Sequence, residues 1–187
     1  MSGRVYFLGD NHFKHEKIWR GRGFNSMEEH DVAVALSIFE TCGRDDSLYL
    51  LGDISFGGAV AFHQAMMTAW RLHRRKVGGP VPAEVDRPKF SINVVPGNHD
   101  KSKMLRDLIV SGWITNYHPL REFRVGGQKV VATHVPIHPD CLDRWGINVH
   151  GHLHAHSIND HRYKCVSWEH HKKPVWIEDL IKPRDIV

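Results

Sequence analysis

Short apolar runs alternate with stretches of helical periodicity along the first half of the chain. The runs at 5–8, 48–51 and 90–95 lead into glycine-containing polar segments, a pattern typical of buried strands. From Ser26 onward, and again across 58–76, apolar residues recur every three or four positions, which predicts amphipathic helices. Strands that alternate with helices in this way predict an α/β domain with sheet at its centre.

The second half of the chain is richer in strands. Two strand-like segments, 120–125 and 128–133, flank Gly126-Gly127 and predict a β-hairpin. The other elements expected here are a helix at 102–110, strands at 147–150 and 162–166, and a closing segment of undetermined type at 174–181. Since the sequence shows no internal repeat or linker, we expect a single domain, 1–187.

Local signals define several element ends. Ser26 is a predicted helix N-cap, with Glu29 at the capping-box position. The basic run 71–76 favours the C-terminal end of the second helix, where cations offset the helix dipole. The proline- and glycine-containing segment 77–88 predicts an irregular loop.

Composition narrows the class of protein. With 41% hydrophobic and 25% charged residues, the chain suits a folded globular domain. No apolar run approaches the roughly 20 residues of a membrane-spanning helix, and the three cysteines lie far apart without a CxxC motif. We therefore expect a cytoplasmic protein without membrane contact. The formal net charge of +4 favours anionic ligands but does not by itself indicate nucleic-acid binding.

Histidine, acidic and amide residues gather where the predicted strands end. The chain contains 16 histidines. The segments that follow five strands are Gly9-Asp10-Asn11-His12, Gly52-Asp53, Gly97-Asn98-His99-Asp100, Thr133-His134 and His150-Gly151-His152-Leu153-His154. Ligands of open α/β sheets bind beyond the carboxyl ends of strands, and a glycine beside each group permits close backbone approach. These segments are therefore expected to form one site.

The chemistry of these groups predicts a pair of divalent metals. Carboxylate, imidazole and amide ligands without thiolate suit Mn, Fe, Zn or Ni. Asp10-x-His12 and His152-x-His154 are i, i+2 pairs, which project to one side of an extended segment. A two-metal site holds its ions about 3.5–4 Å apart with a hydroxide between them as the nucleophile. Asp53, alone on its loop, is the expected bridging ligand.

Each group taken alone has an ordinary structural alternative. Asp10 is compatible with a turn, Asp53 and Asn98 with helix caps, and His134 with a hydrogen-bonded core histidine. Because five such coincidences at five strand ends are improbable, the constellation as a whole favours the metal site.

The order of these motifs, D-x-H, G-D, G-N-H-D, a later H and G-H-x-H, resembles the calcineurin-like metallophosphoesterase superfamily. The resemblance runs from Val5 to about Ile181 and is greatest for small single-domain members from bacteria and phages. It includes the D-x-H-F-x-H of 10–15 and the tail segments 166–169 and 173–175. It implies two facing β-sheets flanked by helices, a four-layer αββα sandwich.

The resemblance also implies residue roles. The ligands of one metal would be Asp10, His12, Asp53 and His154, and those of the second would be Asp53, Asn98, His134 and His152. His99 would donate a proton to the leaving group. Mn²⁺ is the expected ion, with Fe, Zn or Ni as alternatives.

The sequence departs from the family pattern after the G-D motif. Many relatives carry a carboxylate there that orients the catalytic histidine, whereas this chain has Ile54-Ser55-Phe56. That role falls to Asp100 or to no residue. His15 and Arg22 are candidate substrate-binding residues, and a solvated Arg22 is at least as consistent with the sequence.

The resemblance implies a metal-dependent phosphodiesterase that hydrolyses small phosphodiesters such as 2′,3′-cyclic nucleotides, as a monomer or homodimer. One alternative is a nuclease, which is not favoured because the sequence lacks an added domain and a dense basic-aromatic surface. A second alternative is a catalytically inactive scaffold of the same fold. Such a scaffold would be expected to lose ligands, and here every motif position is filled.

Overall fold

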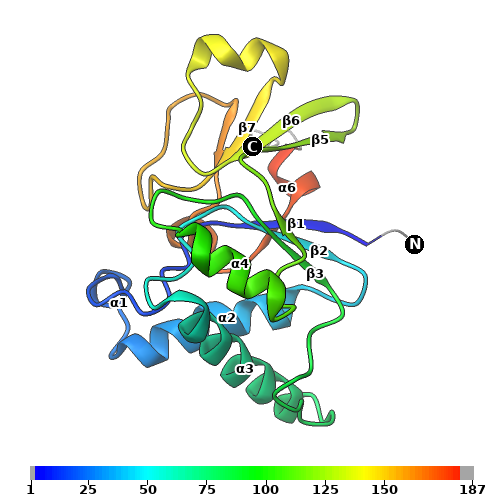
Figure 1. The fold of residues 1–187 in the computed structure, drawn as a ribbon. Helices are drawn as coiled ribbons and strands as arrows, with labels where there is room; N and C mark the ends of the chain where they lie inside the picture. Colours follow the sequence, from blue (N-terminus) through cyan, green and yellow to red (C-terminus); the bar gives the residue numbers. More distant parts are fainter. Residues whose placement is uncertain (1–2, 182–187) are drawn as a thin grey trace, which may run out of the picture.

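The computed structural model describes residues 3–181, which form two β-sheets with helices around them (Figure 1). The first sheet has the order β4-β3-β2-β1-β9, made of β1 Val5–Leu8, β2 Ser47–Leu50, β3 Ser91–Val94, β4 Asn116–Tyr117 and β9 Val175–Trp176. Its strands are parallel except β9. The second sheet has the order β5-β6-β7-β8, made of β5 Arg121–Val125, β6 Gln128–Thr133, β7 Ile147–His150 and β8 Tyr163–Cys165.

The helices differ widely in length. They are α1 Ile18–Gly21, α2 Met27–Thr41, α3 Gly58–Lys76, α4 Ser102–Val110, the 3₁₀ helix η1 Pro139–Arg144, α5 Trp168–His171 and α6 Ile177–Ile181. In Figure 1, α2 and α3 lie on the side of the first sheet that faces away from β5, β6 and β7. No helix within residues 3–181 has both the length and the apolar character needed to cross a membrane.

The first sheet separates two hydrophobic cores. In β1, Tyr6 and Leu8 pack into the core shared with the helices, whereas Phe7 packs into the core shared with the second sheet. In β2, Leu48 packs into the core shared with the helices and Tyr49 into the core shared with the second sheet, since successive side chains of a strand point to opposite faces. A sheet covered on both faces needs apolar residues on both, which explains the continuous apolar runs.

The predicted mixed α/β architecture, with two sheets and flanking helices, is confirmed. The hairpin is β5–β6, and the basic run occupies the last turn of α3. The closing segment proves to be β9 followed by α6. The capping-box prediction is half right. Ser26 Oγ accepts from the backbone N–H of Glu29 at 3.0 Å, but the Glu29 carboxylate turns to Asn25 instead of Ser26.

Candidate metal centre

The first group of predicted ligands consists of Asp10 and His12, from the loop after β1, and His154, from the loop after β7. Each offers a ligand atom, and these atoms lie within 4.8 Å of one another. Asp10 Oδ1 is 3.6 Å from His12 Nε2, and both atoms are buried without a hydrogen-bond partner. Buried polar atoms without partners are costly. Their convergence therefore favours a cation among them.

The second group consists of Asp53, His134 and His152, whose ligand atoms also lie within 4.8 Å of one another. His134 donates from Nδ1 to the carbonyl of Leu51 at 2.8 Å, so in the neutral ring Nε2 carries the lone pair. That atom lies 2.9 Å from Asn98 Oδ1 and 3.2 Å from His152 Nδ1. A cation is the species that several converging lone pairs would stabilise.

The carboxylate of Asp53 is ionised in this setting. Burial tends to raise its pKa, but the nearby His134 ring and the hydrogen bond from the backbone N–H of His99 outweigh burial and lower the pKa to about 2. Asp53 Oδ2 lies 3.5 Å from His134 Nε2. The carboxylate is thus a full negative charge within the second group, and its bridging role toward the first group stays a prediction.

Most of the predicted ligands have left-handed backbone conformations. Their φ angles are 58° at Asp10, 55° at His12, 50° at Asp53, 69° at His152 and 51° at His154. Positive φ is uncommon outside glycine and costs about 1–3 kcal/mol at each position, so it concentrates where function requires it. The expectation that the two i, i+2 pairs lie on extended segments is therefore wrong.

Glycines permit the close approach that was expected beside these groups. A Cβ atom on Gly52 would lie 2.4 Å from His134 Nδ1, and one on Gly97 would lie 2.2 Å from Asp53 Oδ1. Both contacts are far below van der Waals separation, so only glycine fits at these two positions.

A partly buried network behind His154 was not predicted from the sequence. Glu169 Oε1, in α5, lies 3.0 Å from His154 Nδ1 and 2.8 Å from Arg22 Nη2. Burial raises the pKa of Glu169, but the His154 hydrogen bond and the Arg22 charge lower it to about 2. With Nδ1 bound to a carboxylate, His154 is fixed with Nε2 available for a metal.

Arg22 does not serve as the substrate-binding residue considered above. Its side chain is 1% exposed, and Nη2 donates to the carbonyl of Asp10 at 2.7 Å as well as pairing with Glu169. A guanidinium held in this way cannot reach a substrate in the site. The structure corrects the role of Arg22 to support of the β1 loop and of Glu169.

Replacement of Glu169 by glutamine is expected to weaken divalent-metal binding by about 10–100-fold, because removal of an outer partner of a ligating histidine has that effect. Calorimetric titration with Mn²⁺ measures the change. Glu178→Gln, an exposed glutamate in α6, is the matched control and should bind metal like the parent protein. Equal affinities for both variants would contradict the role of Glu169.

Asp100 supports the loops of the site and does not contact the His99 ring. Its Oδ1 accepts from the backbone N–H of Ile54 and its Oδ2 from that of Gly97, both at 2.9 Å. Burial raises the pKa of Asp100, and this effect outweighs the two hydrogen bonds, which lower the pKa. Within residues 3–181 no contact joins its carboxylate to the His99 imidazole, so the expectation that Asp100 is catalytic or orients His99 is corrected to a loop-holding role.

His15 lies beside the first group, with its ring centroid 5.4 Å from that of His12. Its Nδ1 accepts from the backbone N–H groups of Lys17 and Ile18, at 3.1 and 3.2 Å. One ring nitrogen is therefore committed to the start of α1. Substrate binding by the other nitrogen stays a prediction.

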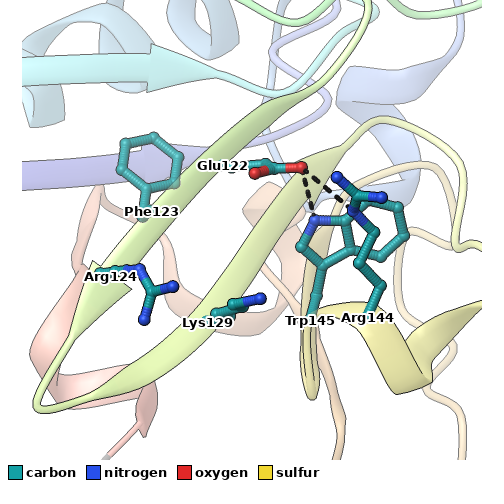
Figure 2. A pocket seen from close by; sticks show the side chains of 6 residues that line it. All are labelled: Glu122, Phe123, Arg124, Lys129, Arg144 and Trp145. Carbon is teal, nitrogen blue, oxygen red and sulfur yellow. Dashed lines mark hydrogen bonds and ion pairs between the residues drawn. The ribbon is translucent and has the colours of Figure 1, made fainter.

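A separate pocket of about 300 Å³ lies beside the β5–β6 hairpin (Figure 2). Arg124, Lys129 and Arg144 line it, and Glu122 accepts from the Trp145 indole N–H at 2.8 Å. Lys129 precedes His134 by five residues, which is roughly 16 Å along a strand. This pocket is therefore distinct from the metal groups.

Comparisons with known proteins found relatives in phages and a solved structure with a similar fold. No family model matches it. The Gene 66 protein of Mycobacterium phage L5 is 24% identical over 175 residues, which cover 82% of this chain and 79% of the phage protein. The Gene 66 protein of Mycobacterium phage D29 is 34% identical over 95 residues, 46% of each chain. A crystal structure of a protein of unknown function from Aquifex aeolicus superposes with a TM-score of 0.66 at 19% identity, covering 96% of this chain and 98% of that one. This structural likeness shows a common fold, and the chemistry must be argued from the site.

Proposed function

We propose that the chain is a dinuclear-metal-dependent phosphodiesterase of the calcineurin-like metallophosphoesterase type, and that its fold is the four-layer sandwich of that superfamily. The observation that carries the proposal is the division of the predicted ligands into two groups. His154 joins Asp10 and His12, whereas His152 joins Asp53 and His134. Two histidines only two positions apart thus go to different groups, as the family resemblance implies.

Two divalent cations held by these groups would stabilise the charge of a phosphate and activate water. The oxygen and nitrogen ligands, which include no thiolate, favour Mn²⁺, with Fe, Zn and Ni as alternatives. The chain itself supplies a proton donor. His99 is exposed, and its backbone N–H bond to Asp53, at 2.9 Å, holds it beside the second group. From there its imidazole would protonate the departing oxygen.

We favour a small phosphodiester, such as a 2′,3′-cyclic nucleotide, over a nucleic-acid strand because the sequence carries no dense basic-aromatic surface. Strand binding depends on cations that track many phosphates. Arg22, the arginine considered for phosphate contact, is buried and paired with Glu169. The inactive-scaffold alternative is disfavoured because seven ligands and His99 are all retained.

A hydrolysis screen tests the proposal. The protein reconstituted with Mn²⁺ would be offered a 2′,3′-cyclic nucleotide, a bis-nitrophenyl phosphodiester, a nitrophenyl monoester and single-stranded DNA. We expect both small diesters to be cleaved faster than the monoester and the DNA. His152→Ala, purified identically, controls for contaminating enzymes. Preferred cleavage of DNA would favour the nuclease, and no cleavage by protein with two bound ions would favour the scaffold.

A further inference from the structure

Phe56 occupies the segment where many relatives of the family carry an orienting carboxylate. The residue is 41% exposed, and its ring packs against three imidazoles. The ring centroid lies 5.2 Å from that of His12 in a stacked arrangement, 4.4 Å from that of His15 and 4.8 Å from that of His99. Phe56 is therefore in contact with both a predicted metal ligand and the predicted proton donor.

The His99 imidazole has no hydrogen-bond partner within residues 3–181. Asp100, the nearest carboxylate in sequence, is committed to the backbone N–H groups of Ile54 and Gly97. The aromatic contact of His99 is with Phe56, at an interplanar angle of 39°. The His99 imidazole is therefore restrained by packing against the Phe56 ring.

The Phe56 ring is itself well placed to act as a restraint. Its backbone N–H donates to the carbonyl of Phe13 at 2.8 Å, which ties the loop after β2 to the loop after β1. Ser55 Oγ donates to the carbonyl of Gly58 at 2.9 Å, on the other side of Phe56. A phenylalanine has only two side-chain torsions, so fixing its backbone leaves the ring few positions.

We propose that Phe56 is the positioning residue for His99. The apolar ring fixes the imidazole by packing, in place of a hydrogen bond to a carboxylate, and it has no atom that can ligate a metal. Because the ring contacts His12 and His99 at once, it holds the proton donor at a set place relative to the first ligand group. The role in catalysis rests on the proposed function, whereas the packing itself is independent of it.

A double-mutant cycle with two readouts tests the proposal. The variants are Phe56→Leu, which keeps apolar bulk but removes the ring, Phe56→Tyr, which keeps the ring, His99→Ala, and Phe56→Leu combined with His99→Ala. The first readout is the NMR shift of the His99 ring protons in metal-free protein, assigned by their loss in His99→Ala. The second is kcat and KM on a 2′,3′-cyclic nucleotide and on a bis-nitrophenyl phosphodiester, with bound metal counted for each variant.

We expect Phe56→Leu to move the His99 ring signals, because the aromatic ring current is lost, while two ions stay bound. The kcat on the cyclic nucleotide should fall roughly 10–100-fold, the range expected for a misplaced catalytic group. The loss on the nitrophenyl diester should be smaller, since nitrophenolate leaves without a proton. Phe56→Tyr should behave like the parent protein. With His99 already replaced by alanine, Phe56→Leu should cost less than about 2-fold more, as expected of coupled residues.

Unchanged His99 signals in Phe56→Leu would overturn the proposal whatever the activity. A rise in KM with kcat unchanged would assign Phe56 to substrate stacking and would also overturn the proposal. Equal kcat losses from Phe56→Leu in the parent protein and in His99→Ala would overturn it as well. If the parent protein hydrolyses no phosphoester, the proposed phosphodiesterase function fails. The NMR arm still decides in that case whether the Phe56 ring packs on the His99 imidazole.

Discussion

Exhaustive removal of divalent metal should reduce phosphodiester hydrolysis to the uncatalysed background, and added Mn²⁺ should restore it best. The attacking water must lose a proton, and coordination to a divalent metal would lower its pKa to about 7. Residues 3–181 gather these side chains into two groups that could each hold a metal ion, and the proposed reaction depends on water activated there. The expected loss is therefore complete.

The measurement is turnover of protein shown to be metal-free by elemental analysis, before and after titration with Mn²⁺, Fe²⁺, Zn²⁺ and Ni²⁺. A second readout is thermal unfolding, because an ion that binds only the folded state stabilises it by about 2.7 kcal/mol at 100 times its dissociation constant. Full turnover by metal-free protein would end the two-metal proposal.

Asp53→Asn should abolish hydrolysis and release both ions together. The substitution keeps the shape of the side chain but removes the full negative charge that a pKa of about 2 guarantees at neutral pH. It also weakens the acceptor that holds the His99 backbone N–H. A bridging carboxylate serves both ions, so neither site should keep its affinity.

Metal stoichiometry distinguishes the outcomes for Asp53. Asp140→Asn is the matched control, because the Asp140 side chain is 90% exposed, and it should keep two ions. If Asp53→Asn loses one ion and retains the other, Asp53 belongs to the second group alone and does not bridge. Circular dichroism of each variant checks that the fold is retained.

The sequence predicts much of this architecture because the periodicity of apolar residues directly reflects which faces are buried. The first sheet is covered on both sides, so its strands appear as continuous apolar runs, and α3 spans the predicted range 58–76. The two groups that could hold metal ions can also be anticipated, because each predicted ligand follows a strand and the resemblance assigns His152 and His154 to different metals.

Contacts between distant segments could not be predicted in the same way. Glu169 and Arg22 are 147 residues apart, and no local pattern shows that an arginine in a glycine-rich segment is buried against a glutamate in α5. The left-handed conformations of His12 and His154 are equally hidden, because histidine has no preference for positive φ strong enough to reveal them. The sequence shows only that the segment containing Phe56 lacks the carboxylate found in many relatives. The ring contacts of Phe56 depend on the tertiary fold.

The left-handed conformations of the predicted ligands have a consequence for engineering this protein. At Asp10, His12, Asp53, His152 and His154 the backbone occupies a region that glycine enters without cost. A redesign that optimised backbone conformation alone would therefore favour glycine at these positions and would remove the predicted ligands. Thermostabilised variants of this protein should accordingly be selected for bound metal as well as for heat resistance.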